Sequence, residues 1–290
     1  PDNNSIALSD GTTATYDVLV VNPGLQLRYD LIEGAQEALD DIDAPVGSMY
    51  YLEGAYKTSV LRDNFRGGNA VFTCPKFPIK CGGAPQKILY LSESTFRQKG
   101  IRDDTNVKYY SATPIIFPPN DDFSEALTEQ CDSKGIDKFL NHNLVAIDKD
   151  NRVATFQNMS NDETVTQDFD MLHIVPPQTA PAFIRNSPLA HETGWLDVNI
   201  NTLRHNRFAN VFGHGDVAHL PTPKTAAAIY SQTPVLVQNI LAQLGEAQRE
   251  ALYDGQSGCP IFTGDGKLML CEFKYGRETS TTFLKDQTAP

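Results

Sequence analysis

Short apolar runs of the kind that form buried strands alternate along this chain with segments that have helical spacing. The clearest runs are residues 16–21, 68–73 and 169–175, and the clearest helical segments are 84–96 and 121–134. Strands that alternate with helices favour an α/β fold whose sheets are mostly parallel. Further elements are expected as strands at 106–110, 115–117, 144–148, 152–157 and 267–273, as helices at 52–61 and 225–244 (kinked or split at Pro234), and as a loop at 253–263.

Length and charge exclude several classes of protein. A chain of 290 residues suits two domains, or one large domain with an insertion. The net charge of −12 argues against a nucleic-acid partner, because a phosphate backbone is held by clustered Lys and Arg side chains. No apolar run reaches the roughly 18–20 residues that a membrane-spanning helix needs.

The stretch 210–228 has the pattern of a ligand site. Val211 and Phe212 read as a strand end, Gly213 and Gly215 allow close approach of the backbone, and Asp216 precedes a Pro-containing turn and an Ala-rich helix start. Free N–H groups at a helix start favour anionic groups, and a carboxylate beside them can hold hydroxyls. The alternative is an ordinary turn, because a lone Gly-Asp pair is weak evidence.

The loop at 74–87, CPKFPIKCGGAPQK, follows a strand where a dinucleotide-binding unit would carry Gly-x-Gly-x-x-Gly. The cradle for a pyrophosphate is therefore missing at this position. Cys81 lies in this loop beside Lys80, just before a predicted helix, and a nearby ammonium group and a helix N-terminus both favour the reactive thiolate. The alternative is a partly buried structural cysteine. Cys74 could pair with Cys81.

The remaining cysteines divide into two kinds. Cys259 precedes Pro260 in a Gly-containing loop, whereas Cys131 and Cys271 lie on apolar faces and are expected in the core. No C-x-x-C pair occurs and the histidines lack ligand spacing, so we expect no metal site. Two loop cysteines near a candidate cofactor site suggest redox chemistry, although spacing alone does not show that they meet.

Longer segments of the chain resemble a known family. The segments 74–93, 171–177, 194–205, 210–228 and 258–264 are similar, in order and approximate spacing, to those of the mitochondrial-type sulfide:quinone oxidoreductases. These are flavoproteins with tandem Rossmann-like dinucleotide-binding domains, in the disulfide-reductase-like superfamily. The resemblance covers almost the whole chain.

The resemblance implies an activity and a set of site residues. Cys81 and Cys259 match a redox-active pair that carries a bridging sulfur; hydrogen sulfide attacks the bridge, a persulfide forms, and two electrons pass through FAD to ubiquinone. The persulfide sulfur then moves to sulfite, glutathione or coenzyme A. FAD would be held by Gly24, Gly215, Asp216, Lys224 and Thr225.

The resemblance also implies domain limits and a location. Residues 1–28 match a remnant of an FAD-binding domain, 29–185 a second Rossmann-like domain, 186–245 the return of the first, and 246–290 the start of a quinone- and membrane-facing region. The family docks peripherally on the mitochondrial inner membrane through parts that this chain lacks. The family's first FAD fingerprint is also absent, so we expect a fragment with weak FAD binding at best and little turnover. Alternatives are a related NADH:quinone reductase and a degenerate, non-catalytic scaffold protein.

Overall fold

The computed structural model describes residues 3–282 and 288, and the chain divides into two compact units. Unit 1 comprises Pro1–Gln26, Thr179–Gly258 and Phe273–Ser280, and unit 2 comprises Leu27–Gln178, Cys259–Glu272 and Thr281–Pro290. The strands β4 (Gln26–Leu27) and β13 (Gln178–Thr179) lie at two of the points where the chain passes from one unit to the other. The predicted identity of each part as a cofactor-binding domain stays a prediction.

A parallel sheet forms the centre of unit 2. Its strand order is β5 (Val46–Gly47), β12 (Met171–His173), β6 (Gly68–Cys74), β7 (Thr105–Ser111) and β8 (Asp137–Phe139), and each neighbouring pair is parallel. Val71 and Phe72 in β6 are fully buried, as expected for a strand covered on both faces. The strands predicted at 68–73 and 106–110 are confirmed with ends one residue different, and of the strand predicted at 169–175 only Met171–His173 has strand conformation.

An antiparallel sheet covers one face of this parallel sheet. It consists of β9 (His142–Asp148), β10 (Val153–Asn158) and β11 (Thr164–Asp168), and one shared core includes residues of both sheets together with α1 (Ala35–Asp40). The 3-10 turn η1 (Tyr29–Leu31) precedes α1. The expectation of mostly parallel sheets is met by the central sheet of unit 2, whereas a short turn joins β9 to β10 in this antiparallel sheet.

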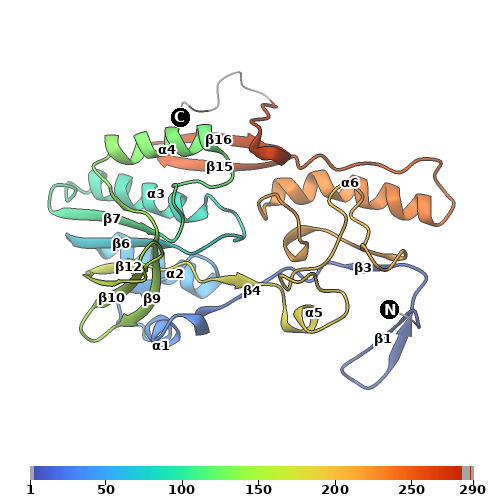
Figure 1. The fold of residues 1–290 in the computed structure, drawn as a ribbon. Helices are drawn as coiled ribbons and strands as arrows, with labels where there is room; N and C mark the ends of the chain where they lie inside the picture. Colours follow the sequence, from blue (N-terminus) through green and yellow to red (C-terminus); the bar gives the residue numbers. More distant parts are fainter. Residues whose placement is uncertain (1–2, 283–287, 289–290) are drawn as a thin grey trace. The chain divides into compact units, whose positions relative to one another are not determined.

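Helices and a hairpin lie on the opposite side of the parallel sheet (Figure 1). α3 (Ala84–Gln98) packs on β6 and β7, and α2 (Leu52–Asn64) packs on β5, β12 and α3. α4 (Asp121–Ser133) begins at Asn120, whose side chain accepts a hydrogen bond from the N–H of Phe123. The hairpin of β15 (Ser257–Gly264) and β16 (Lys267–Phe273) lies over α3.

Two local predictions for these segments are wrong. Residues 257–263 were expected in a loop but belong to β15, because Pro260 lies at an exposed position of a two-stranded hairpin, where its missing N–H costs no internal bond. Residues 115–117 were expected in a strand but have no strand conformation, although Ile116 and Phe117 are buried. Apolar character alone did not distinguish a buried loop from a strand there.

Glu93 on α3 is fully buried beside three cations. Its carboxylate contacts the guanidinium of Arg97, Arg102 Nε at 3.2 Å and Lys134 Nζ at 3.3 Å. We expect Glu93→Gln to lower the free energy of unfolding by about 2–4 kcal/mol, because removing one partner of a buried ionic cluster leaves the other charges uncompensated. Denaturant unfolding followed by circular dichroism measures this change.

The matched control for Glu93→Gln is Asp132→Asn. Asp132 is paired with Lys138, but its side chain is 66% exposed. An exposed pair contributes about 1 kcal/mol or less, so this variant should unfold almost as the unmodified protein does. If both variants lose the same free energy of unfolding, the Glu93 cluster does not stabilise the fold more than an exposed ion pair does.

Unit 1 contains a short parallel pair of strands, β3 (Leu19–Val21) and β14 (Val211–Gly213), with Val21 opposite Gly213. α6 (Ala226–Gln243) packs on β14 and on the 3-10 turn η2 (Gly215–Val217). The unit also holds a hairpin of β1 (Ser5–Ala7) and β2 (Thr13–Thr15), the short helix α5 (Ala182–Arg185) and the 3-10 turn η3 (Tyr275–Arg277).

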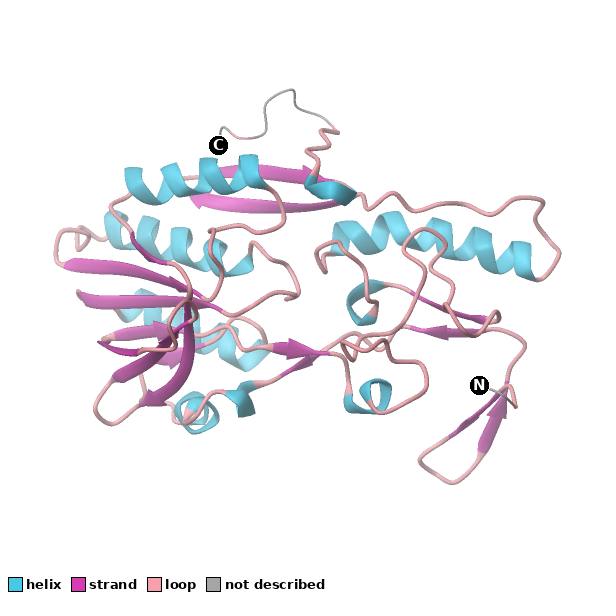
Figure 2. Cartoon of the chain, in the orientation of Figure 1, coloured by secondary structure: helices cyan, strands magenta, loops and turns pink. Residues whose placement is uncertain are grey.

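The helix predicted at 225–244 is confirmed as α6, but the split that was one of the two effects predicted for Pro234 does not occur. Figure 2 shows α6 as one continuous helix, so Pro234 does not split it. Pro234 is exposed, and water can satisfy the carbonyl that loses its helical donor on that side. Within the part of the chain that the structure describes, no helix combines the length and apolar character needed to cross a membrane.

Candidate functional site

Two cysteines that are 178 residues apart in the sequence meet in unit 2. The Sγ atoms of Cys81 and Cys259 lie 3.3 Å apart. Cys81 has a left-handed backbone conformation (φ 53°) in the turn before α3, and its carbonyl accepts the N–H of Ala84 in the first turn of that helix. Cys259 lies on β15 and is 1% exposed. The structure therefore brings together the two cysteines that the sequence singled out.

Gly83 makes this approach possible. A Cβ atom at Gly83 would lie 2.8 Å from the Cys259 sulfur and 2.8 Å from Ile261 Cγ1. Real Cβ atoms are not found that close, so any side chain at position 83 would displace β15 from the N-terminus of α3. The Gly-Gly sequence after Cys81 thus has a packing role as well as a role in the turn.

Lys87 is the cation of this site. Its Nζ atom lies 3.3 Å from the Cys81 sulfur, one turn into α3. The hydrogen bond from the Cys259 thiol, and then the ammonium of Lys87, lower the pKa of Cys81 to about 6, against the opposing effect of burial. The same hydrogen bond and burial raise the pKa of Cys259. Cys81 is therefore the thiolate of the pair at neutral pH, and Cys259 is the thiol that donates to it.

The sequence pointed to a different lysine. Lys80 was expected to supply the ammonium beside Cys81, but its Nζ atom donates to the carbonyl of Tyr50 instead. Because α3 begins at Ala84 and winds once before Lys87, the side chain at position 87 points back to the turn that holds Cys81. The helical period after Gly83 was the available clue to Lys87.

We expect Lys87→Met to raise the pKa of Cys81 and to slow its alkylation at acidic pH. Loss of a contacting opposite charge raises such a pKa by about 1–2 units, so alkylation at a pH below both values should slow by about 10- to 100-fold. Iodoacetamide labelling across pH, with Cys81 followed by peptide mass spectrometry, gives the profile. Lys80→Met is the control and should leave the profile in place; an unchanged profile in Lys87→Met would contradict the role of Lys87.

The three other cysteines are buried and unreactive by environment. Burial raises the pKa of Cys74 to about 12 and that of Cys131 to about 11, and it also raises the pKa of Cys271. All three are 3% exposed or less. The core positions predicted for Cys131 and Cys271 are confirmed. The suggested pairing of Cys74 with Cys81 is wrong, because the sulfur beside Cys81 belongs to Cys259.

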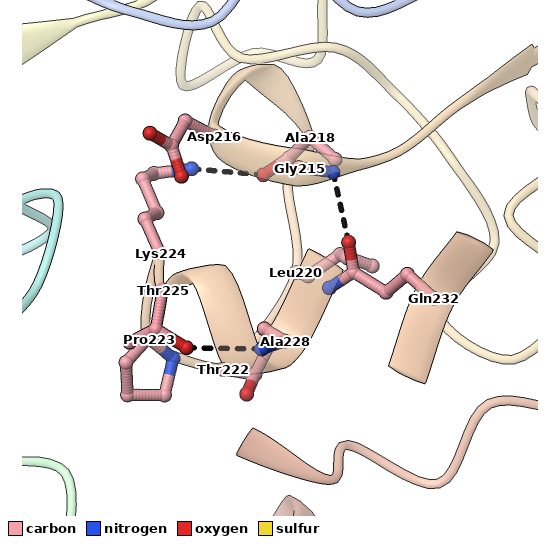
Figure 3. Close-up of a pocket in the computed structure, with 10 residues that line it drawn as sticks. All are labelled: Gly215, Asp216, Ala218, Leu220, Thr222, Pro223, Lys224, Thr225, Ala228 and Gln232. Atoms are coloured by element: carbon pink, nitrogen blue, oxygen red, sulfur yellow. Dashed lines mark hydrogen bonds between the residues drawn. The ribbon is translucent and has the colours of Figure 1, made fainter. Parts of the chain in front are cut away.

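The candidate cofactor residues lie in unit 1. Gly215, Asp216, Lys224 and Thr225 line one small cavity between η2 and the start of α6 (Figure 3). Gly24 is not part of its lining. It has a positive φ of 75° in the turn after β3, where a Cβ atom would meet nothing within 4 Å. Because β3 and β14 are parallel neighbours, Gly24 and Gly215 follow two strand ends on the same edge of the pair.

Lys224 is a buried cation within this group. In Figure 3 its side chain points toward the turn that carries Asp216, and Nζ donates to the carbonyl of Ala218 at 3.0 Å. The ammonium also lies 3.8 Å from the centroid of the Trp195 ring. Burial lowers the pKa of Lys224 to about 7, with the negative charge of Asp216 acting in the opposite direction. An electron-rich ligand group at this place would stabilise the charged form.

Two residues that the sequence did not single out hold this group in place. Trp195 provides the aromatic face under Lys224, and Gln232 on α6 accepts the N–H of Gly215 at 2.8 Å. Thr225 caps α6, since its Oγ1 atom accepts the N–H of Ala228 at 3.0 Å.

The polar groups around this cavity fit a cofactor that carries hydroxyl and anionic groups. It combines a carboxylate, a helix N-terminus and a buried ammonium, and His214 beside it has a buried Nδ1 atom without a hydrogen-bond partner. Over residues 3–282 and 288, no three His, Cys, Asp or Glu side chains gather in a way that could hold a metal ion. The roles predicted for the residues at both sites stay predictions.

Curated relatives match nearly the whole chain, although no protein-family model matches it. The chain is 40% identical over 290 residues to a protein of Dictyostelium discoideum, and 37% identical over 289 residues to one of Mus musculus; both are named "Sulfide:quinone oxidoreductase, mitochondrial". Each alignment covers 99% of this chain. The chain spans 63% and 64% of the length of these relatives. The family resemblance predicted from the sequence is confirmed.

Two solved structures show the same fold. A chain of the Tetrahymena thermophila mitochondrial ATP synthase matches with a TM-score of 0.87 and 27% identity, over 100% of this chain and 71% of that one. The sulfide:quinone oxidoreductase of Aquifex aeolicus matches with a TM-score of 0.77 and 16% identity, over 95% of this chain and 69% of that one. The predicted class of tandem Rossmann-like α/β domains is confirmed.

Proposed function

We propose that this chain provides the cysteine pair and part of the flavin site of an enzyme that oxidises hydrogen sulfide. The proposal is supported by its resemblance, over nearly its whole length, to the mitochondrial-type sulfide:quinone oxidoreductases. The electrons go to ubiquinone. Because the chain spans under two thirds of these relatives, the activity is proposed for the protein that contains this sequence. A mitochondrial location is in line with the relatives' names, and within the mitochondrion we propose peripheral attachment to the inner membrane.

The separation of 3.3 Å between the Cys81 and Cys259 sulfurs carries this proposal. In the oxidised pair, joined as a disulfide, a hydrosulfide ion attacks the sulfur of one cysteine and displaces the other cysteine as a thiolate. The bond to sulfide forms as the bridging bond breaks, so a persulfide remains on one cysteine. A thiol or sulfite then takes the outer sulfur, which leaves two reduced cysteines to be reoxidised.

The environment of the pair divides the two roles. Cys81, with its pKa lowered to about 6 beside Cys259 and Lys87, is the better leaving group and the thiolate that remains. Lys87 holds that negative charge at 3.3 Å. Cys259 is buried and its pKa is raised, so its thiol stays protonated until the pair is oxidised. We therefore assign the persulfide to Cys259 and the thiolate to Cys81.

The cofactor residues would hold FAD from one side of unit 1. Asp216 would accept hydrogen bonds from ribityl hydroxyls, Lys224 and Thr225 would lie at the pyrimidine edge of the ring, and Gly24 and Gly215 would let the backbone approach. FAD, when bound, supplies the two-electron acceptor that reoxidises the cysteine pair.

A second candidate is a non-catalytic subunit of a mitochondrial complex. The likeness to a chain of the Tetrahymena ATP synthase favours it, because that chain has this fold and is named only as part of the assembly. The cysteine pair with its neighbouring lysine favours the enzyme, since a scaffold role gives no reason for a thiolate held by an ammonium group.

Sulfide-dependent reduction of a short-chain ubiquinone by the FAD-loaded protein tests the proposal. The expected result is quinone reduction that requires both sulfide and an acceptor such as sulfite. A flavin-loaded protein that reduces no quinone under these conditions would contradict the proposed activity, and a protein that binds no flavin at all would support the non-catalytic subunit.

A further inference from the structure

We propose that Ser94 and Asp265 are positioning residues that set Cys259 against Cys81 by fixing the β15–β16 hairpin on α3. This inference rests on the proposed role of the two cysteines as a redox pair. Cys81 is carried by the turn before α3, whereas Cys259 is carried by the hairpin, so the distance between the sulfurs depends on how the hairpin is held.

The contact lies at the tip of the hairpin. Ser94 Oγ donates to Asp265 Oδ1 at 2.8 Å and accepts the N–H of Asp265 at 3.3 Å. Ser94 is 4% exposed, whereas the Asp265 side chain is 49% exposed, so both bonds are partly shielded from water. Gly264 permits the approach, because a Cβ atom there would lie 2.9 Å from Ser94 Cβ. The tip therefore touches α3 as closely as the cysteine end does at Gly83.

The contact at Gly83 and the contact at Ser94 are separated by the same distance along α3 as along β15. From Gly83 to Ser94 the chain advances about 16 Å, at the helical rise of about 1.5 Å per residue. From Cys259 to Gly264 the strand advances about 16 Å as well, at about 3.3 Å per residue. The strand and the helix thus meet at both ends of one segment. A shift of β15 along α3 by two residues, the repeat of side chains on one face of a strand, would break the tip contact and carry Cys259 away from Cys81.

Charge strengthens the tip contact. Lys134 Nζ lies 3.7 Å from Asp265 Oδ2 and is itself held by the buried Glu93. The hydrogen bond from Ser94, and then the ammonium of Lys134, lower the pKa of Asp265. The acceptor of the Ser94 bond is therefore a carboxylate, and charge-assisted hydrogen bonds are the stronger kind.

Positioning of this kind changes the oxidation equilibrium of the pair. The sulfurs must close from 3.3 Å to about 2.05 Å when a disulfide forms. With glutathione disulfide as oxidant, one disulfide forms in the protein, one breaks in glutathione, and two glutathione thiols are released. A loose hairpin lowers the effective concentration of Cys259 at Cys81 and shifts this equilibrium toward the reduced protein.

Ser94→Ala is the first test, in the full-length protein equilibrated with glutathione buffers and analysed by mass spectrometry. We expect the equilibrium constant for the Cys81–Cys259 disulfide to fall by about three- to tenfold, the effect of losing a partly exposed, charge-assisted hydrogen bond. Thr95→Ala is the matched control, since its hydroxyl donates to the carbonyl of Leu91 within α3. It should leave the constant unchanged.

Asp265 gives a second test from the opposite side of the contact. Its φ of 56° is left-handed, and both Asn and Gly accept that conformation, so Asp265→Asn and Asp265→Gly should fold alike. Asn keeps an acceptor for Ser94 and should retain most of the equilibrium constant, whereas Gly removes the acceptor and should match Ser94→Ala.

The outcomes separate the two proposals. Equal constants in the unmodified protein, Ser94→Ala and Asp265→Gly would overturn the role of Ser94 and Asp265, while the redox pair would stand. The absence of any Cys81–Cys259 disulfide in the unmodified protein would overturn both. The expected shifts in a protein that never oxidises sulfide would uphold the positioning role and contradict the proposed activity.

Discussion

Serine at position 81 or at position 259 is expected to abolish sulfide oxidation, with turnover lower by about 10³-fold or more. A hydroxyl cannot form the bridge to sulfur that sulfide attacks, so either substitution removes the first step rather than slowing it. The two losses should be alike and should not add in the double variant, because the cysteines act as one unit. Steady-state quinone reduction measures turnover.

The control for these variants is Cys131→Ser, which replaces a third cysteine in unit 2. Cys131 is fully buried on α4, and its sulfur lies near the hydroxyl of Tyr90, not near Cys81. Its turnover per folded molecule should stay within about twofold of the unmodified protein. Retained turnover in both Cys81→Ser and Cys259→Ser would remove the cysteine pair from the mechanism.

Alanine at position 216 is expected to weaken FAD binding by about 100-fold. A carboxylate that accepts hydrogen bonds from ligand hydroxyls contributes about 1.5–3 kcal/mol, which corresponds to about 10- to 150-fold in Kd. In this site Asp216 also acts electrostatically on the buried Lys224, so its loss leaves that lysine less readily charged. Quenching of FAD fluorescence on titration with protein gives the Kd.

Asp197→Asn is the matched control for flavin binding. Asp197 is a carboxylate of the same unit, but it accepts a hydrogen bond from Asn206 and does not line the cavity at Asp216. FAD affinity should be unchanged in this variant. If Asp216→Ala binds FAD as tightly as Asp197→Asn does, the assignment of Asp216 to the cofactor is wrong.

The sequence predicted elements best where local patterns and tertiary packing agree. α3 was expected at 84–96 and runs Ala84–Gln98, and the strand expected at 68–73 runs Gly68–Cys74. Both combine a clear period with a Gly- or Pro-containing boundary. The turn with Gly215 and Asp216 was likewise found from its own residues, because glycine, carboxylate and helix start are adjacent in the chain.

The remaining parts depend on contacts between distant segments. Cys259 reads as a loop residue because Gly258 and Pro260 flank it, and only the partner strand β16 makes this segment a strand. Lys87 was missed because a lysine on an amphipathic helix usually points to water. The contact of Ser94 with Asp265 joins residues 171 positions apart, and no local pattern encodes it.

Anaerobic mixing of the FAD-loaded protein with sulfide is the most direct test of the central claim that Cys81 and Cys259 pass electrons from sulfide to a flavin. Stopped-flow absorbance follows the visible flavin band in the unmodified protein and in Cys259→Ser. We predict rapid bleaching in the unmodified protein and none in the variant. A flavin band that persists with sulfide in the unmodified protein, or that bleaches equally in both, would contradict the account.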